Sequence, residues 1–392
     1  MFNLTKKIAF LFSIFATQLF AKISCEINAK NAILINADSG AVLFEKNGYE
    51  KAYPASVTKI STTIFILENY SNKLDDSFIA SETALRKINS DLKKTSKYPP
   101  YILENDGSSF DIVLSENLKL WDRLHGVMVC TGNDAANMAA EALSGNINTF
   151  MKDLNRFLQN IGCLSTNFLN PHGLHVEEHM TTTYDLALMT RYALNNPDFV
   201  KLFSCKYFLR PQTNKKQKKE LITYNKLLKP GKYYYPHIIG SKTGYHSKAK
   251  YTLVSSAKKN DRTLILALMG SSSSEQRYED TIKLLELAFS ETQVTKKLID
   301  KDKIFLAEFE GAAKNVKAKL NNDLEFSYYP SEETPTTVSL VFEDIRAPIK
   351  KGQKVGKILI KDQNDRVLKK EILYSSENVR KRLFYALKKL FI

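Results

Sequence analysis

The feature that most constrains this chain is a proline followed by a long, unbroken apolar run. Pro54 opens the segment Pro-Ala-Ser-Val-Thr-Lys, which leads into the mostly apolar residues Ile60–Leu67. Proline suits the first turn of a helix, and no residue of the following run would break one. The pattern therefore predicts a buried helix that begins near Pro54.

Two reactive side chains lie three residues apart at the start of this predicted helix. Ser56 and Lys59 would share one face, so the Lys59 amine could reach the Ser56 hydroxyl and activate it as a base. Only a neutral amine can act in this way. Since the ordinary lysine pKa is about 10.4, burial or a second cation must lower the pKa of Lys59.

The Ser-x-x-Lys pattern alone does not establish a nucleophile. In a structural alternative, the Ser56 hydroxyl satisfies backbone N–H groups at a helix start while Lys59 extends to solvent. The same pattern also occurs elsewhere, for example at Ser90/Lys93, Ser255/Lys258 and Ser256/Lys259. The context of the motif has to decide between the two interpretations.

The N-terminus has the pattern of a secretory signal peptide. Lys6 and Lys7 precede the apolar run 8–16, which is short for a membrane span, and Ala21 offers a small residue for cleavage. We therefore expect residues 1–21 to be a signal peptide and the mature chain to be exported. A formal charge of +15 on such a chain, without basic motifs interleaved with aromatics, favours an anionic lipid or cell-wall polymer over nucleic acid.

The length of the mature chain suggests two domains, over residues 22–292 and 293–377. The second contains short alternating runs that predict a small β-sandwich without a catalytic cluster. The four cysteines are too few for a disulfide scaffold and match no zinc spacing, which leaves room for one bridge.

The first domain is expected to combine an antiparallel sheet with helices. Hairpins are predicted over 32–44 and 251–269, and the polar stretch 88–110 reads as a long surface excursion. Helices are predicted over 118–129, 135–143, 150–161, 184–194 (behind the cap-like Thr183) and 277–289.

Two further polar motifs accompany the Ser56 segment. Thr131-Gly-Asn133 lies in a loop between two predicted buried helices, a favourable place for site residues. Lys242-Thr-Gly244 lies just before the second hairpin. In a regular strand Lys242 and Gly244 would point to one side, and the glycine would let a substrate lie against the backbone.

A turn histidine, His172, suggests a Ser-His triad. No carboxylate is placed to orient it, so a structural role is favoured.

Together, Ser56-Val-Thr-Lys59, Thr131-Gly-Asn133 and Lys242-Thr-Gly244, in this order, resemble the low-molecular-mass penicillin-binding proteins, specifically the D-alanyl-D-alanine carboxypeptidases. The likeness runs from about residue 32 to the C-terminus. It implies an α+β fold with an antiparallel sheet flanked by helices, as in serine β-lactamases and D,D-peptidases, plus the C-terminal β-domain.

The resemblance also implies a reaction. Ser56 would attack the peptide bond between two terminal D-alanines of a peptidoglycan stem peptide, giving an acyl-enzyme that water hydrolyses without metal or cofactor. Lys59 would be the general base, and Thr131 and Asn133 would relay protons and hold the peptide. Threonine at 131, where the family has serine, keeps the hydroxyl but stiffens χ1.

Five residues are implied on the substrate side. Lys242 and Thr243 would bind the terminal carboxylate, and Lys242 would lower the pKa of Lys59. Gly244 and Arg277 are further candidates for substrate contact. The backbone N–H of Tyr245 would form an oxyanion hole with that of Ser56.

Several alternatives stay open at this point. A β-lactam antibiotic would acylate Ser56 by the same chemistry, and we identify no extra base that would make the chain a β-lactamase. A D,D-endopeptidase or transpeptidase would use the same acyl-enzyme. A rival of another class is a non-catalytic wall-binding protein that keeps this fold.

The C-terminal residues 378–392 predict an amphipathic helix. Basic residues fall on one face, and apolar residues fall on another, at Val379, Leu383, Ala386, Leu387 and Leu390. We expect this helix to attach the protein peripherally to an anionic membrane, at the periplasmic face of the cytoplasmic membrane. The alternative is a helix docked on its own domain.

Overall fold

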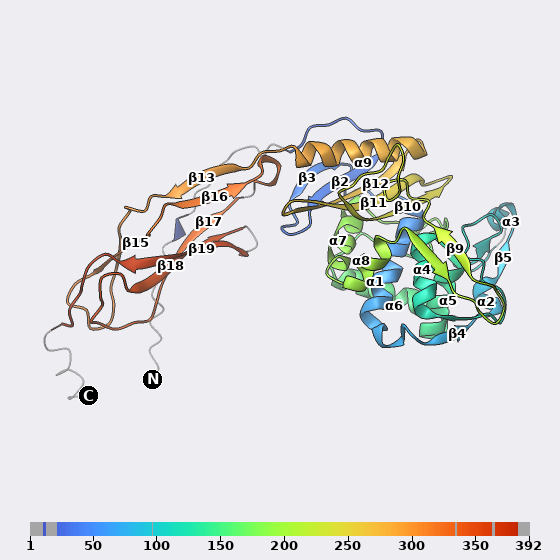
Figure 1. Ribbon diagram of the computed structural model, residues 1–392, viewed down its shortest axis with the longest axis horizontal. Coiled ribbons are helices and arrows are strands. Elements are labelled where there is room, and N and C mark those ends of the chain that lie inside the picture. The colour runs from blue at the N-terminus through green and yellow to red at the C-terminus, as the bar shows by residue number, and fades with distance from the viewer. Residues whose placement is uncertain (1–10, 13–21, 96, 334, 363–364, 383–392) are drawn as a thin grey trace. The chain divides into compact units, whose positions relative to one another are not determined.

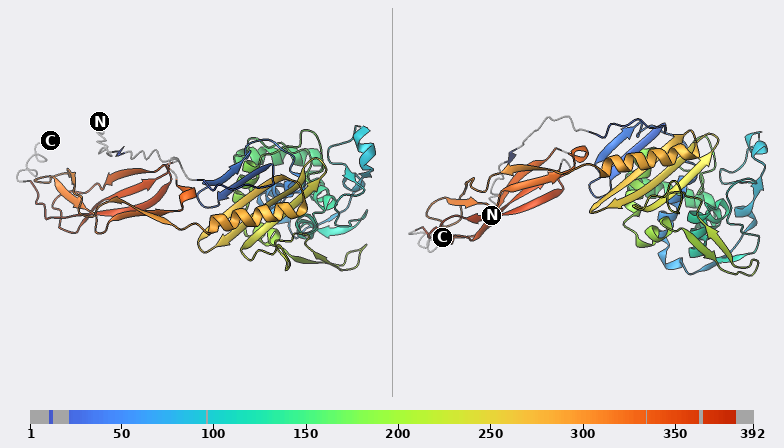
Figure 2. Two further views of the ribbon diagram at one scale, coloured as in Figure 1. Left: turned by 90° about the horizontal axis from the view of Figure 1, so that it is seen from above. Right: turned by 45° about the horizontal axis from the view of Figure 1, so that its top comes forward.

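The computed structural model describes residues 11–12, 22–95, 97–333, 335–362 and 365–382. It divides into two compact units, a large unit over Lys22–Ser290 and a small unit from Glu291 onward (Figures 1 and 2). Most of the predicted signal peptide, residues 1–10 and 13–21, lies outside the described residues. Leu11–Phe12 forms β1, which pairs antiparallel with a strand of the small unit.

A five-stranded antiparallel sheet organises the large unit, in the order β10-β11-β12-β2-β3. β2 (Asn31–Asn36) and β3 (Val42–Lys46) form one hairpin, and β11 (Lys250–Lys259) and β12 (Arg262–Ser271) form another. Both predicted hairpins are thus confirmed. β10 (Ile238–His246) is an edge strand.

The two faces of the sheet carry different cores because side chains alternate along each strand. Ile33 and Ile35 of β2 pack in a core with the helices of the large unit, whereas Leu34 faces α9 (Ser274–Phe289). Figure 1 shows α9 on one side of the sheet, and α1 (Lys59–Asn69) with the other long helices on the opposite side.

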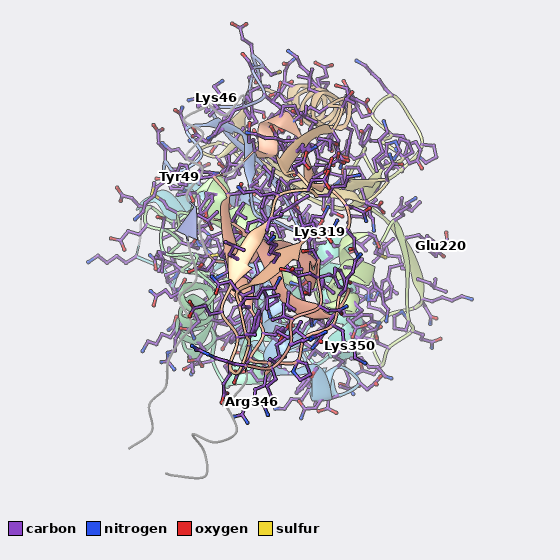
Figure 3. All side chains as sticks on the ribbon, turned by 90° about the vertical axis from the view of Figure 1, so that its left-hand side faces the viewer. Lys46, Tyr49, Glu220, Lys319, Arg346 and Lys350 are labelled. Carbon is purple, nitrogen blue, oxygen red and sulfur yellow. The ribbon has the colours of Figure 1, made fainter. Side chains whose placement is uncertain are left out.

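The remaining elements of the large unit complete the helical layer and its edges. The helices are η1 (Ala55–Thr58), η2 (Ser71–Lys73), α2 (Glu82–Leu85), α3 (Ser90–Thr95), α4 (Leu120–Val129), α5 (Asn133–Ser144), α6 (Ile147–Asn160), α7 (Thr183–Ala193) and α8 (Pro197–Phe203). The short strands pair as β4 (Ser77–Ile79) with β7 (Asn117–Lys119), β5 (Lys87–Ile88) with β6 (Leu103–Glu104), and β8 (Tyr207–Arg210) with β9 (Lys219–Ile222). The β8–β9 hairpin lies at the outer edge of the unit, where Figure 3 labels Glu220.

Several helix starts differ from the prediction. After Pro54 the chain first forms the 3₁₀ turn η1, and the α-helix begins only at Lys59. The cap of α7 is Thr182, whose side chain accepts a hydrogen bond from the Asp185 N–H, and not Thr183. The predicted surface excursion 88–110 is only partly exposed, because Ile102, Leu103 and Phe110 in it are buried.

The small unit is a β-domain with a core of its own, built around residues such as Val316, Leu324 and Ile358. Its strands are β13 (Val294–Ile299), β14 (Phe305–Ala307), β15 (Val316–Lys319), β16 (Leu324–Tyr328), β17 (Thr337–Phe342), β18 (Lys354–Lys361) and β19 (Val367–Ser375), with η3 (Pro330–Glu332). One sheet has the order β1-β17-β18-β19-β15-β14, and β13 pairs with β16.

Many charged side chains lie on the surface of the small unit. Figure 3 labels Lys319, Arg346 and Lys350, and Arg346 forms an ion pair with Glu310 at 2.7 Å.

The predicted C-terminal helix is wrong for its first residues. Val379 lies in an isolated bridge opposite Ile349 and is buried in the core of the small unit, and Lys381 bridges to Ala312. Residues 378–382 therefore belong to the β-domain. Val379 is buried in the core of that domain and does not lie on the apolar face of a helix. Residues 383–392 of the predicted helix lie outside the described residues. No helix within the described ranges is long and apolar enough to cross a membrane.

Candidate active site

Ser56 and Lys59 meet as the sequence predicts, although a 3₁₀ turn and not an α-helix carries the serine. The Lys59 Nζ atom lies 3.0 Å from Ser56 Oγ. Lys59 is completely buried at the first position of α1, whereas Ser56 is half-buried. The structural alternative of a lysine that extends to solvent is excluded.

The Lys59 amine has three oxygen neighbours, and two of them can only accept hydrogen bonds. They are Asn133 Oδ1 at 2.7 Å and the backbone oxygen of His172 at 2.6 Å. A neutral amine carries two N–H donors and one lone pair. If the donors go to these two oxygens, the lone pair is left facing the Ser56 hydroxyl, which is the geometry of a general base.

The electrostatic surroundings favour the neutral form of this amine. Burial lowers the pKa of Lys59 well below its ordinary value, and the nearby Lys242 lowers it further, against a smaller effect of Asp134 in the opposite direction. Burial, together with the charge of Arg277, lowers the pKa of Lys242 to about 7.

Lys242 reaches across the site to the second polar motif. Its Nζ atom donates to Thr131 Oγ1 at 2.7 Å and to the backbone oxygen of Thr243 at 3.0 Å. Thr131 lies between α4 and α5 with a φ of 55°, a left-handed backbone that is uncommon for a β-branched residue. The three motifs therefore converge on one place.

β10 follows regular alternation through the site. Its only register shift lies between Ile238 and Gly240, so Lys242 and Gly244 share a face, as expected without a bulge. A Cβ atom on Gly244 would lie 2.7 Å from the backbone nitrogen of Ser56. Glycine is required here because the strand backbone lies directly against the serine. Tyr245 points away and packs its ring on Tyr251, with centroids 4.5 Å apart.

Arg277 lies beneath this strand and is 8% exposed. Its Nη1 atom donates to the backbone oxygen of Gly244 at 3.1 Å, and its Nη2 atom donates to the Tyr278 hydroxyl at 3.1 Å. The guanidinium thus fixes the position of the Gly244 peptide and adds positive charge near Lys242.

Sequence reasoning missed the contributions of His172 and Asp134. The His172 carbonyl holds the Lys59 amine, while its ring is buried against the Tyr101 carbonyl at 3.2 Å, so the favoured structural role fits. Asp134 accepts hydrogen bonds from the backbone N–H groups of Phe110 and Ile112 and fixes that loop beside Asn133. The position of Asp134 directly after the Thr131-Gly-Asn133 motif was the sequence signal that could have indicated its role.

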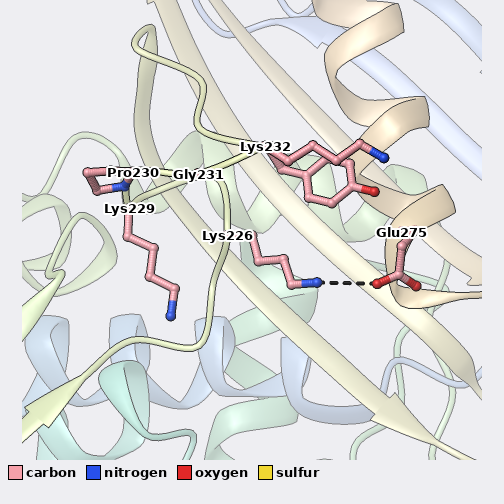
Figure 4. A pocket seen from close by; sticks show the side chains of 7 residues that line it. Lys226, Lys229, Pro230, Gly231, Lys232 and Glu275 are labelled. Carbon is pink, nitrogen blue, oxygen red and sulfur yellow. Dashed lines mark hydrogen bonds and ion pairs between the residues drawn. The ribbon is translucent and has the colours of Figure 1, made fainter.

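A separate pocket of about 470 Å³ lies at the start of α9 and is not lined by the residues around Ser56 (Figure 4). Lys226, Lys229 and Lys232 line it with Tyr233 and Glu275, and Lys226 pairs with Glu275 at 3.2 Å.

Among the described residues, no group of three histidine, cysteine or acidic side chains is placed to hold a metal ion. All four cysteines, Cys25, Cys130, Cys163 and Cys205, are unpaired.

Several known proteins are similar to this chain in sequence. Residues 17–273 match the family described as D-alanyl-D-alanine carboxypeptidase, Peptidase S11, and residues 294–381 match the penicillin-binding protein 5 C-terminal domain. The D-alanyl-D-alanine carboxypeptidase DacF of Bacillus subtilis is 31% identical over 362 residues, which cover 91% of this chain and 87% of that protein.

Solved structures show the same fold. Penicillin-binding protein 5 from Haemophilus influenzae has a TM-score of 0.64 at 24% identity and covers 92% of this chain and 100% of its own. A variant of the Streptomyces K15 DD-transpeptidase has a TM-score of 0.59 at 24% identity and covers 68% of this chain and 100% of its own. The chain belongs to the serine-type D-alanyl-D-alanine carboxypeptidase family.

Proposed function

We propose that Ser56 is the nucleophile and Lys59 the general base of a D-alanyl-D-alanine carboxypeptidase that acts on peptidoglycan stem peptides. The observation that carries this assignment is the set of contacts of the Lys59 amine. Two acceptor-only oxygens, Asn133 Oδ1 and the His172 carbonyl, leave its lone pair for the serine hydroxyl.

The proposed reaction has two steps. Ser56 Oγ attacks the carbonyl carbon of the penultimate D-alanine and gives its proton to the Lys59 amine. The C–N bond then breaks, and a proton returns to the leaving D-alanine amine by way of Lys59 and Thr131. Water hydrolyses the resulting ester, with Lys59 again accepting the proton, and Ser56 is regenerated.

The substrate would lie along β10. Lys242 and Thr243 would bind its terminal carboxylate, and the peptide would pass over Gly244, whose missing side chain leaves the Ser56 backbone accessible. The N–H groups of Ser56 and Tyr245 would stabilise the oxyanion. Arg277 would hold the Gly244 peptide in position through its hydrogen bond to the Gly244 carbonyl.

Intact-mass analysis with a β-lactam tests the nucleophile. We expect one covalent adduct on the wild-type protein and none on Ser56→Ala, because the opened ring stays attached to the serine as an ester. No adduct on folded wild-type protein would contradict the proposal and favour a non-catalytic wall-binding protein.

Transpeptidation is the second candidate, supported by the shared fold with the Streptomyces K15 DD-transpeptidase. The two reactions differ in whether water or an amine accepts the acyl group. A pentapeptide substrate incubated with and without a second stem peptide separates them. We expect released D-alanine and a shortened peptide in both incubations. A cross-linked product would instead indicate a transpeptidase, and cleavage of a cross-linked dimer would indicate a D,D-endopeptidase.

Exported location and peripheral membrane attachment form the last part of the proposal. Residues 383–392 contain Lys388 and Lys389 among apolar residues, a composition suited to an anionic membrane surface. Because Val379 belongs to the β-domain core, the deletion that tests attachment must start after Arg382. We expect that deletion to release the enzyme from membranes with its β-lactam acylation intact.

A further inference from the structure

His246 is the last residue of β10 and lies on the same face of the strand as Lys242 and Gly244. Side chains two residues apart point to the same side of a strand, so Lys242, Gly244 and His246 share the face that adjoins Ser56. The rise along a strand is about 3.3 Å per residue, which places His246 roughly 7 Å beyond Gly244.

His246 belongs to a cluster of three rings beside the serine. Its ring centroid lies 5.4 Å from that of His175 and 6.1 Å from that of Tyr53. His175 contacts Tyr53 edge-on, with centroids 4.7 Å apart. Tyr53 lies three residues before Ser56, so the cluster borders the site.

Each imidazole has a ring nitrogen that hydrogen-bonds to no group within the described ranges. The His246 Nδ1 atom accepts a hydrogen bond from the Ala249 N–H at 3.1 Å, so its own proton is on Nε2, a donor. The Nδ1 atom of His175 is enclosed and has no hydrogen-bond partner among the described residues. A buried N–H group without an acceptor costs free energy, so the proton of the His175 ring is better placed on Nε2, which is then a donor.

The charges that face the cluster make it a poor place for a cation. Lys93 and Lys248 act on His175 more strongly than Glu104 and Glu177 do. Lys93 is paired with Glu104 at 2.9 Å, while Lys248 is exposed. An anionic group would be attracted and could accept hydrogen bonds from the imidazoles.

The direction in which the substrate peptide runs along β10 decides which of its residues reaches the cluster. If the terminal carboxylate lies at Lys242 and the attacked carbonyl at Ser56, the rest of the peptide runs toward His246. In an extended peptide the Cα atom of the residue before the two D-alanines lies up to about 5 Å from the attacked carbonyl carbon, since one Cα–C bond and one Cα–Cα step separate them. The side chain of that residue can therefore extend as far as His246.

We propose that His175, His246 and Tyr53 form a specificity subsite for a carboxylate on the side chain of the residue that precedes D-Ala-D-Ala. This inference rests on the proposed function for the direction of the peptide. The subsite distinguishes a stem peptide whose third residue carries a side-chain carboxylate from one whose third residue does not.

Two peptides that differ by one carboxylate test the subsite. Both have the form X-D-Ala-D-Ala, where X is lysine or 2,6-diaminopimelate and all amino groups are acetylated, and chelator is present throughout. We expect the wild-type kcat/KM to be about tenfold higher for the diaminopimelate peptide, since hydrogen bonds to a charged group are among the stronger ones. Equal values for the two peptides would overturn the inference.

Variants identify the residues responsible. The double variant His175→Leu/His246→Leu should bring the ratio of the two kcat/KM values close to one, and His246→Gln, which keeps a donor, should retain most of the preference. Lys248→Glu should lower the ratio about two- to threefold through its charge alone. The matched control Lys258→Glu, at the opposite end of β11, should leave the ratio unchanged. A ratio that none of the three subsite variants moves would contradict the assignment.

Binding separates this inference from the proposed function. Calorimetry on Ser56→Ala measures the two peptides without turnover. Tighter binding of the diaminopimelate peptide supports the subsite even if no hydrolysis occurs, and equal binding overturns it. A missing β-lactam adduct on the wild type, in contrast, overturns only the proposed chemistry.

Discussion

At the scale of single residues, the site depends on keeping one buried lysine neutral. Lys59 has no carboxylate within ion-pair distance among the described residues, and its oxygen neighbours are an amide, a peptide carbonyl and the serine hydroxyl. Burial and the charge of Lys242 both oppose its protonation. In the proposed function the second lysine therefore has two roles, since Lys242 would also bind the substrate carboxylate.

The pH dependence of acylation should reveal this coupling. Acylation needs neutral Lys59, so its rate rises with pH through the Lys59 pKa. Removing the Lys242 charge in Lys242→Gln raises that pKa, and the acid limb of the profile should move to higher pH. Stopped-flow acylation by a chromogenic β-lactam measures it, and a limb that stays or moves to lower pH would refute the coupling.

Thr131 can be tested by shape-matched changes. Thr131→Val removes the hydroxyl that accepts the Lys242 hydrogen bond, and we expect acylation to slow about a hundredfold, as for other acid–base groups. Thr131→Ser keeps the hydroxyl and removes a β-branch from a left-handed backbone. Its acylation rate should stay within about threefold of the wild type, with equal or higher thermal stability; similar losses in both variants would indicate a purely structural role.

At the scale of elements, the approach of β10 to η1 is the critical fit. A Cβ atom on Gly244 would also lie 2.4 Å from Thr252 Oγ1, so Gly244→Ala must push the strand away from the serine. We expect acylation to fall about a hundredfold, because small displacements of reacting groups cost that much. The control is Gly48→Ala, whose added Cβ meets mainly the flexible Glu45 side chain. Equal activity in the two variants would contradict this argument.

A buried ion pair attaches the β8–β9 hairpin to the large unit. Arg210 Nη2 and Glu116 Oε1 are 2.6 Å apart, and both side chains are at most 2% exposed. Glu116→Leu leaves the guanidinium buried and unpaired, so the free energy of unfolding should fall by about 3–5 kcal/mol. Urea denaturation measures this loss. The double variant Glu116→Leu/Arg210→Leu should recover much of it, and a double variant as unstable as the single one would refute the pairing argument.

The accuracy of sequence reasoning differed between elements for physical reasons. Long apolar runs predicted the sheet hairpins and most helices, because burial requires those patterns. The 3₁₀ turn at Ser56 was missed, since its backbone is set by packing against Gly244 and Gly173 and not by local preference. β13 and β15 were missed because exposed lysines, such as Lys296 and Lys317, mask their alternation.

The contacts of the candidate site were predictable where they involve side chains of a sequence motif, and they were not predictable where they involve a backbone atom. The approach of Lys59 to Ser56 follows from their spacing, but the His172 carbonyl has no side-chain signature. The predicted C-terminal helix was wrong at Val379. This residue has the spacing of an apolar helix face, but it packs in the core of the small unit.

At the scale of the whole molecule, the two units have separate hydrophobic cores. The cores of the large unit contain only residues before 290, and that of the small unit only residues after 298. All residues assigned to the reaction, from Ser56 to Arg277, lie in the large unit.

A truncated protein tests this independence. Residues 22–290 produced alone should fold and react with a β-lactam at a rate within about twofold of the full chain, since no assigned residue is removed. Thermal unfolding shows whether the fragment is cooperative, and acylation shows whether it is competent. A folded fragment without acylation would mean that the small unit contributes to the reaction.

The central sheet joins the two ends of the large unit, because β2 pairs with β12 and β10 comes from the same late segment. During synthesis the serine and its lysine emerge from the ribosome long before Lys242 and the strands that would enclose them. A nascent chain therefore carries its reactive alcohol without a working pocket. Hydrolytic competence is therefore gained only when the whole large unit folds, as the final strands of the sheet close around residues made near the beginning.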